Sequence, residues 1–331
     1  MRAWRLLAGA LLVAGVAACG STGTSTETPA GSSAASSADP ATRTIEHAMG
    51  STKISGQPRR VVALDQSFVD AVLTLETPVI GYTTYRSIDT KLPDYLGPLV
   101  AQYGKEATSV GTLEQPSLEK IAALKPDLIV SAKVRHEALY DKLSKIAPTV
   151  FSETTGAIWK DNLRLMGRAL GKEDLADSRI KAFEERAGKI GTAIKDKQGG
   201  KLPTISIVRF AGEPTVRLYV EKSYSGVVLK DVGFPRPEGQ PTKDDAIAVD
   251  VSQERIADLD ADHIFVATYP DPASDGPKEK FVGNPLWGRL KGEKHEVSDL
   301  TWMSAVGIQG AHAILDDLAQ TFSVDPAKPA S

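Results

Sequence analysis

The chain has 331 residues, of which 24% are charged and 41% hydrophobic, with 39 basic against 42 acidic side chains. A formal net charge of −3 argues against nucleic acid as a partner, because nucleic-acid-binding proteins usually present a strongly basic face. The single cysteine, Cys19, excludes an intramolecular disulfide.

The first eighteen residues have the pattern of a secretory signal that is removed from the mature protein. Arg2 and Arg5 precede an apolar run, Leu6 to Val16, which is much shorter than the roughly 20 residues of a membrane span. Small residues then lead directly to Cys19, and this arrangement resembles the bacterial lipobox, in which the thiol receives a diacylglycerol and becomes the new N-terminus. We therefore expect a lipoprotein signal peptide at 1–18 and an acylated, palmitate-bearing Cys19. The alternative is an ordinary secretory signal followed by a chance cysteine.

A polar segment of low complexity follows the cysteine. Residues 20–42 are mostly Ser, Thr, Ala and Gly, and such a stretch cannot bury enough apolar surface to offset the entropy of ordering it. We expect 19–43 to be a flexible tether between the membrane and the folded part. About 285 residues remain, enough for two lobes of ordinary size.

Short strand-like runs alternate with helical ones in the next part of the chain. Strands are predicted at 60–64, 79–82, 127–130 and 148–151, and helices at 68–75, 118–124 and 139–146. Alternation of this kind indicates a largely parallel sheet covered by helices, so we expect an N-terminal α/β lobe over 44–158.

Helical periodicity dominates residues 159–199. Apolar residues from Trp159 to Leu170 step by four, three and four, and Gly171 then offers a helix stop. A second helical stripe over Glu173–Lys197 spans roughly 37 Å at 1.5 Å per residue, although Gly188 and Gly191 weaken it. The segment is long enough to be a helical linker between two lobes.

Strand and helix signals alternate again over 200–325, the predicted C-terminal α/β lobe. Strands are predicted at 205–208, 217–220 and 263–267, and helices at 225–231, 256–259 and 311–319. Residues 118–127 recur as 253–262 at a constant offset of 135, and each copy runs into an apolar strand. A single helix–strand pair can match by chance, but the equivalent positions in the two halves favour two related lobes.

The sequence lacks the usual catalytic signatures. It has no HExxH, CxxC, G-x-S-x-G, Walker or G-x-G-x-x-G motif. None of the five histidines has a second histidine or a cysteine at ligand spacing, and His263, within an apolar strand, is expected in the core. We therefore expect neither an enzyme nor a directly bound metal. A Ser-His-Asp triad assembled in space, as in an anchored hydrolase, stays open as the alternative.

Basic and aromatic side chains gather near the ends of predicted strands. In parallel sheets the ligand crevice lies off the carboxyl ends of the strands. Guanidinium groups suit carboxylates and other delocalised oxygen ligands, and aromatic faces cover the apolar parts of a bulky ligand. Taken singly, each arginine is as consistent with a solvated surface charge, and Arg217, inside an alternating strand, is the weakest. The candidate ligand-binding residues are Arg86, Arg135, Arg209, Trp302, Tyr85, Lys133, Tyr224 and Arg217.

With these residues in view, the sequence resembles the substrate-binding lipoproteins of iron–siderophore ABC transporters over nearly all of residues 44–322. The most specific stretches are Val110 to Ile129, Lys133 to Val150, and the closing part from Trp302 to Leu318. The resemblance implies an α/β fold of two Rossmann-like lobes joined by one long helix, the class III solute-binding type. The ligand would lie in a shallow cleft between the lobes. The siderophore would carry the iron, so no further cofactor is expected.

The resemblance also implies partners and roles. Arg86, Arg135, Arg209 and Trp302 match cleft residues. The implied partners are a ferric siderophore, the subunits of an ABC permease and, through the lipid anchor, the outer face of the cell membrane, with the chain as a monomer. The segment 133–137 resembles binders of carboxylate siderophores.

Three alternatives qualify these implied roles. Glu119 and Glu254 match the glutamates that pair with permease arginines, but a glutamate at a helix start is also favoured by the helix dipole. Ala211-Gly212-Glu213 stands where similar proteins often have a further arginine, which keeps hydroxamate siderophores open. Haem or cobalamin is the alternative ligand of the same fold, with Tyr82, Tyr85 and Tyr224 as candidate axial groups.

Overall fold

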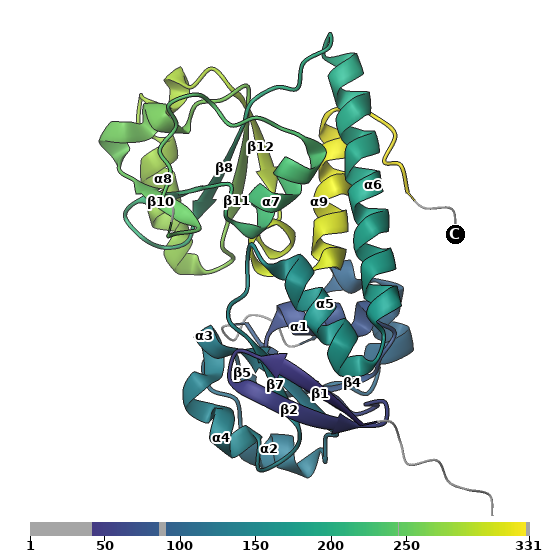
Figure 1. The fold of residues 1–331 in the computed structure, drawn as a ribbon. Coiled ribbons are helices and arrows are strands. Elements are labelled where there is room, and N and C mark those ends of the chain that lie inside the picture. Colours follow the sequence, from purple (N-terminus) through teal and green to yellow (C-terminus); the bar gives the residue numbers. More distant parts are fainter. Residues whose placement is uncertain (1–41, 86–90, 244, 329–331) are drawn as a thin grey trace, which may run out of the picture. The chain divides into compact units, whose positions relative to one another are not determined.

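The computed structural model describes residues 42–85, 91–243 and 245–328 (Figure 1). The predicted signal peptide, Cys19 and Arg86 lie outside the described residues. The predicted tether boundary at 43 is wrong by two residues, because Thr42 and Arg43 already belong to strand β1.

The first of two five-stranded sheets is entirely parallel and has the order β5-β4-β3-β6-β7. Its central strand, Val61-Val62-Ala63, is completely buried, which fits a parallel sheet covered on both faces. Its strands are β3 (Val61–Ala63), β4 (Val79–Thr84), β5 (Thr108–Thr112), β6 (Leu128–Ala132) and β7 (Thr149–Ser152).

The second sheet has the order β10-β9-β8-β11-β12 and is mixed. Strands β8, β11 and β12 run parallel, whereas β9 is antiparallel to both β8 and β10. Its strands are β8 (Ile205–Phe210), β9 (Val216–Tyr219), β10 (Ala248–Val251), β11 (His263–Thr268) and β12 (Glu293–Val297). The expected parallel arrangement therefore holds for three of the five strands.

The internal sequence repeat corresponds to a repeat of topology. In each sheet the first strand is central, the next two extend to one side and the last two to the other. Strand β6 begins at Leu128 and β11 at His263, which are 135 residues apart, as the repeat predicts. The helix before β6 is α2 (Leu118–Ala123), whereas its counterpart before β11 is a 3₁₀ segment, Gln253–Leu259.

The helices follow the periodicity of the sequence most closely in the linker. Helices α5 (Trp159–Leu170) and α6 (Glu173–Lys197) have the predicted bounds, and Gly171 ends α5 in a left-handed conformation with φ +66°. The other helices are α1 (Gln66–Thr74), α3 (Lys133–His136), α4 (Tyr140–Leu143), α7 (Tyr224–Val232), α8 (Asp275–Val282) and α9 (Ile308–Thr321).

Helix α6 packs against α5, α7 and α9, and Figure 1 shows it running beside α9. Gly191, which weakened the sequence prediction, is required by this packing. A Cβ at Gly191 would lie 2.0 Å from the carbonyl oxygen of Val232 at the end of α7. The glycine therefore costs some helix propensity but allows α7 to approach α6 closely.

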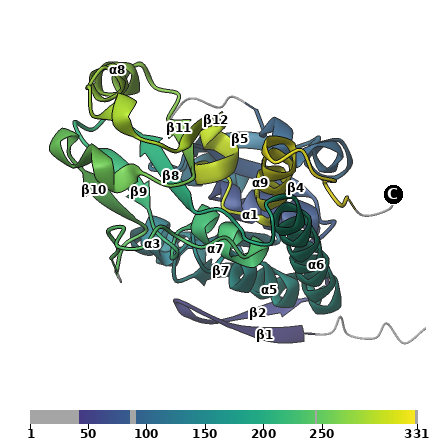
Figure 2. The same cartoon turned by 90° about the horizontal axis from the view of Figure 1, so that it is seen from above.

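A polar hairpin at the start of the described chain was not predicted. Strands β1 (Thr42–His47) and β2 (Gly50–Ser55) pair antiparallel and lie beside β7 and α5 (Figure 2). Only Ile45 and Ile54 are buried hydrophobics in it, so the alternating signal is weak. The Arg43 side chain fixes the hairpin by donating to the carbonyl oxygens of Gly56 and Ala169.

The start of helix α9 is capped by a side chain from helix α1 of the first lobe. Asp70, fully buried in α1, accepts hydrogen bonds from the backbone N–H groups of Gln309, at 3.0 Å, and Gly310, at 3.2 Å. A Cβ at Gly307 would lie 2.3 Å from the Asp70 carboxyl carbon, so only glycine allows this approach. Burial raises the pKa of Asp70 to about 7, although the hydrogen bonds of the α9 start oppose the shift. One carboxyl group thus joins the first lobe to the C-terminal helix.

We expect Asp70→Ala to lower the free energy of unfolding by about 1–3 kcal/mol, because the N–H groups at the start of α9 lose their buried acceptor. Urea unfolding monitored by circular dichroism measures the change. Stability equal to that of the wild type would show that these N–H groups find other partners.

Asp70 should also give stability a characteristic pH dependence. The folded protein holds the Asp70 proton to about pH 7, whereas the ordinary pKa is 3.8, so the unfolded chain releases the proton earlier. The contribution of Asp70 to stability is therefore complete below about pH 4 and declines as pH rises toward 7. Asp70→Asn cannot ionise, so the stability of wild type relative to this variant should decline over that window. Parallel pH profiles for the two proteins would contradict the assignment.

Candidate ligand-binding site

Arg135 is held at the carboxyl edge of the first sheet by a capping aspartate. Asp65, two residues after the end of β3, accepts from the Ser67 backbone N–H through Oδ1 and caps α1. Its other oxygen, Oδ2, accepts from Arg135 Nε at 3.0 Å. The Arg135 side chain remains 36% exposed, so part of the guanidinium fork can still donate to a ligand.

The short helix α3, which carries Arg135, is anchored by a buried histidine. His136 Nε2 donates to the Leu113 carbonyl oxygen at 2.6 Å, so Nδ1 is the acceptor and the Ser131 hydroxyl donates to it at 2.7 Å. Burial lowers the pKa of His136, which keeps the ring neutral. This pair of hydrogen bonds ties α3 to β6 and orients Arg135 next to it.

Lys133 and Tyr85 also lie at this edge. Lys133 begins α3 and forms an ion pair with Glu153 at 3.3 Å. Tyr85 directly follows β4, and its ring meets that of Tyr269 edge-on with centroids 5.9 Å apart. Since Tyr269 directly follows β11, the carboxyl ends of the two sheets lie next to each other at this point.

Arg209 lies at the corresponding edge of the second sheet, but its charge is already paired. Its Nε and Nη2 donate to the two oxygens of Asp299 at 2.6 and 2.9 Å, and Nη1 donates to the Tyr219 hydroxyl. The guanidinium also stacks over Tyr269 at 5.3 Å, and the residue is 6% exposed. Arg209 therefore supports Tyr269 and is not itself open to a ligand in this structure.

Arg217 lies near the same edge because β9 runs antiparallel to β8. Arg209 and Arg217 are direct partners in the strand register. Arg217 is half-buried and forms an ion pair with Glu213, one of the residues that replaces an expected arginine. The pairing reduces the positive charge of the second lobe.

Trp302 is buried, so its predicted place at the cleft surface is wrong for this structure. It has no exposed area, and its indole stacks on Phe265 with ring centroids 4.7 Å apart. The indole N–H donates to Asp317 Oδ2 of α9 at 2.7 Å. The sequence predicts a ligand-facing tryptophan here, but tertiary packing gives both the apolar ring and the polar N–H of Trp302 partners inside the protein.

Tyr224 likewise has a structural role, and it lies in a helix. It is the first residue of α7, is buried, and donates from its hydroxyl to the carbonyl oxygen of Gly307 at 2.7 Å. Its predicted role in ligand binding, and as an axial haem ligand, conflicts with this burial. The contact instead supports the start of α9 beside Asp70.

Glu119 and Glu254 occupy equivalent places in the two halves. Each is exposed near the start of the element before the fourth strand of its sheet, Glu119 in α2 before β6 and Glu254 in the 3₁₀ segment before β11. A hydrogen bond with Ser252 lowers the pKa of Glu254, so this carboxylate is ionised at neutral pH. Both side chains are accessible to a partner.

Three residues of the site were missed by sequence reasoning. Asp65 and Asp299 hold Arg135 and Arg209, and Tyr269 brings the two sheet edges together. Asp65 carries a sequence signal, since an aspartate before a predicted helix is a typical N-cap. Asp299 has no local signal, because its partner lies 90 residues away.

Comparison with known proteins agrees with this architecture. A family model described as periplasmic binding protein matches residues 61–296, more than half of the chain. The probable siderophore-binding lipoprotein YfiY of Bacillus subtilis (strain 168) is 38% identical over 295 residues, covering 85% of this chain and 88% of the relative. The Fe(3+)-citrate-binding protein YfmC of the same organism is 30% identical, with coverages of 83% and 84%. The structure of Staphylococcus aureus SirA complexed with staphyloferrin B has a TM-score of 0.76 and 31% identity, and covers 86% of this chain and 99% of SirA.

Two α/β sheets of matching topology, with one long helix between them, define a solute-binding protein of class III. The chain belongs to the periplasmic binding protein family, whose members are substrate-binding transport proteins. The predicted fold and family are thereby confirmed. Within the described part of the chain, no helix has the length and apolarity needed to cross a membrane.

We expect Trp302→Phe to lower the free energy of unfolding by about 1–3 kcal/mol, because it leaves the Asp317 carboxylate without its buried donor. Trp159→Phe is the matched control, since the buried Trp159 indole nitrogen has no hydrogen-bond partner among the residues that the structure describes. Chemical unfolding of both variants compares the two losses. An equal loss in both would mean that the Trp302 hydrogen bond contributes nothing beyond packing.

Proposed function

We propose that this protein is a lipid-anchored extracytoplasmic binding protein that captures a ferric siderophore and delivers it to an ABC importer for iron uptake. Relatives named for a siderophore and for Fe(3+)-citrate cover more than four fifths of the chain. A similar solved structure holds staphyloferrin B. The iron arrives as the siderophore complex, so the protein needs no cofactor of its own.

The observation that carries the proposal is the preorganised, partly exposed guanidinium of Arg135. Asp65 fixes its Nε and Thr155 Oγ1 lies 3.5 Å from its Nη2, and the partly exposed fork keeps further N–H groups to donate to ligand oxygens at low entropic cost. Charge-assisted hydrogen bonds of this type favour delocalised anionic oxygens. Lys133, two residues away, lies at the same edge, where it is partly exposed and pairs with Glu153 at 3.3 Å.

The second edge contributes little open positive charge. Arg209 is neutralised by Asp299, and Arg217 by Glu213. Between the two edges, the partly buried Tyr85 ring provides apolar area for the body of a siderophore, and the buried Tyr269 ring supports it edge-on. Since the open positive charge lies on the first lobe, a carboxylate siderophore fits better than a hydroxamate. A second relative named for iron dicitrate, from Escherichia coli (strain K12), is 27% identical and agrees with this preference.

Delivery requires surfaces that a permease can recognise. Glu119 and Glu254 are exposed at equivalent places of the two lobes, so a permease with two basic patches would bind both lobes at the same time. Acylation at Cys19 would keep the protein, as a monomer, close to that permease.

Calorimetric titration with ferric carboxylate, hydroxamate and catecholate siderophores, and with haem, tests the ligand. Calorimetry suits this protein because Trp159, Trp287 and Trp302 are all buried. We expect saturable 1:1 binding of a ferric carboxylate siderophore and much weaker binding of the iron-free form. Preference for a hydroxamate would correct the predicted ligand class. If none of the compounds binds, siderophore capture is refuted.

Arg135→Ala should weaken siderophore binding by about 1–3 kcal/mol, because the charge-assisted hydrogen bonds to the ligand are lost. Arg164→Ala is the control, since Arg164 is similarly exposed but pairs with Asp161 and Asp177 on the linker helices. Affinity is measured by the same titration. If both variants bind as the wild type does, Arg135 is not part of the site.

The double charge reversal Glu119→Arg with Glu254→Arg should leave siderophore affinity unchanged and strongly reduce uptake, because like charges repel at the docking surface. Uptake of radioactive iron by cells that carry the protein and its permease is the measurement. Glu185→Arg, an exposed glutamate on α6, serves as the control. Normal uptake by the double variant would remove both glutamates from docking.

A further inference from the structure

Two histidines and a glutamate meet on neighbouring strands of the second sheet. Strands β11 and β12 are parallel, and their register places His263 directly opposite Glu293. His295 lies two residues after Glu293 and therefore on the same face of β12. The sequence has no histidine pair at ligand spacing, and the structure brings this pair together without one. The partners are 32 residues apart and only sheet pairing brings them together.

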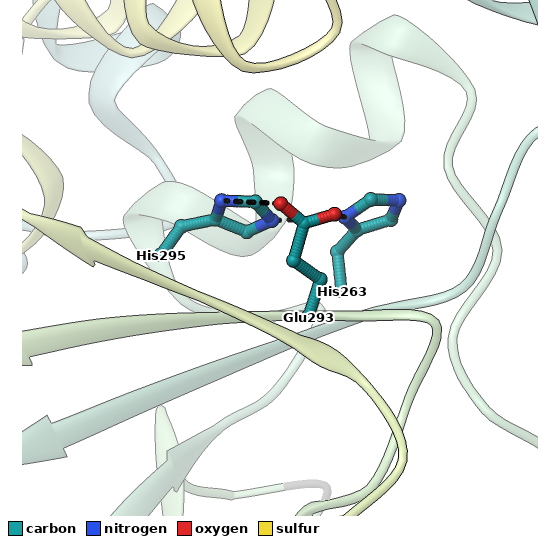
Figure 3. A group of neighbouring side chains, drawn as sticks. All are labelled: His263, Glu293 and His295. Atoms are coloured by element: carbon teal, nitrogen blue, oxygen red, sulfur yellow. Dashed lines mark hydrogen bonds and ion pairs between the residues drawn. The ribbon is translucent and has the colours of Figure 1, made fainter.

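The three side chains converge on one point (Figure 3). His263 Nδ1 and His295 Nε2 are 2.9 Å apart. The Glu293 carboxylate lies against both rings, with Oε2 3.8 Å from His263 Nδ1 and Oε1 4.0 Å from His295 Nδ1. One potential ligand atom from each residue falls within 4.8 Å of the others.

Aromatic neighbours hold the two imidazole rings in place, whereas the Glu293 carboxylate is exposed. The two rings stack at 5.1 Å, Phe322 packs edge-on against His263, and Phe265 packs against His295. The histidine side chains are 15% and 16% exposed, whereas that of Glu293 is 70% exposed on an edge strand. An incoming ion would therefore meet two oriented nitrogens and one carboxylate that can rotate onto it.

We propose that His263, His295 and Glu293 form a binding site for a divalent transition-metal cation of the Zn²⁺ type. Two imidazoles and one carboxylate are a ligand set that Zn²⁺ takes in proteins, with a fourth position left for water. Two nitrogens bound tetrahedrally at 2.0–2.1 Å lie about 3.3 Å apart, close to the observed 2.9 Å, so the pair must break its hydrogen bond and turn both rings toward the metal but needs little separation.

The electrostatic state of the rings supports metal binding. Burial lowers the pKa of both His263 and His295, so both rings are neutral at physiological pH. One of the two facing nitrogens carries the hydrogen of their 2.9 Å hydrogen bond, and a tautomer change of that ring frees its lone pair for a metal. A metal needs unprotonated imidazole, and no proton has to be removed from a cationic ring. The set selects against ferric iron and Mg²⁺, which prefer oxygen ligands.

The site lies at the opposite end of the sheet from the candidate siderophore edge. His263 and Glu293 are the first residues of β11 and β12, whereas Arg209 and Tyr269 lie at or after the carboxyl ends of β8 and β11. A metal there would not touch a ligand in the cleft, and it would link β11 to the edge strand β12. The inference does not depend on the identity of the siderophore.

The test is calorimetric titration of the tag-free, metal-free full chain with ZnCl₂, without any siderophore. We expect saturable 1:1 binding that EDTA reverses. His263→Ala, His295→Ala and Glu293→Gln should each weaken it by at least about tenfold, since even the loss of outer-shell partners costs 10–100-fold. Glu293→Gln is the safest variant for folding, because its side chain is the most exposed of the three.

Two controls separate this site from adventitious binding. Glu296→Gln changes another carboxylate of β12, one that pairs with Lys278, and His47→Gln changes a histidine of the hairpin. Both should retain wild-type Zn²⁺ affinity, and Co²⁺ should give visible absorption bands in wild type that His295→Ala loses. The proposal is overturned if the wild type does not bind Zn²⁺ saturably, or if the three site variants bind it as well as the controls do. The histidines would then be only a structural hydrogen-bonded pair.

Discussion

The buried carboxyl group of Asp70 is the constraint on which the arrangement of the two halves depends. The N–H groups that begin a helix have no partners inside it, and a buried helix start therefore needs an external acceptor. Asp70 provides this acceptor for α9 from a position 239 residues earlier in the chain. The close approach of Asp70 requires glycine at position 307. The Tyr224 hydroxyl donates to the carbonyl oxygen of this glycine. The C-terminal helix is thus fixed to the first lobe as well as to the linker helix α6.

Each sheet carries a guanidinium–carboxylate pair at its carboxyl edge, and burial decides what each pair can do. Asp299 and its surroundings enclose Arg209 almost completely, so the pair organises Tyr219 and Tyr269. Asp65 holds Arg135 by one nitrogen only and leaves it a third exposed. Similar chemistry therefore gives an enclosed structural pair in one lobe and a partly exposed candidate binding group in the other, which makes the open charge of the candidate site asymmetric.

The two ends of the second sheet offer different chemistry. Its carboxyl edge holds arginine and tyrosine side chains that are enclosed and paired with each other and with Asp299, next to the candidate binding edge of the first sheet. The starting edge of β11 and β12 presents imidazole nitrogens, which suit a borderline transition metal. The separation follows from the strand direction, because residues at the start and at the end of one strand cannot meet.

The sequence alone determined what depends on neighbouring residues. Apolar spacing gave the bounds of α5 and α6, and the repeat at an offset of 135 gave the matching positions of β6 and β11. Family resemblance added the two-lobed fold. Local spacing is sufficient to predict the helix bounds and strand positions, because helix periodicity and strand runs are properties of short segments.

Only the tertiary structure decided which side chains are enclosed and which meet. It placed Trp302 and Tyr224 in the core, paired Arg209 with Asp299, and brought His263 to His295. A tryptophan or tyrosine in a loop-like sequence looks the same whether its polar atom faces a ligand or a distant carbonyl oxygen. Burial and pairing depend on contacts between residues far apart in the chain, and the pattern within one segment does not contain that information.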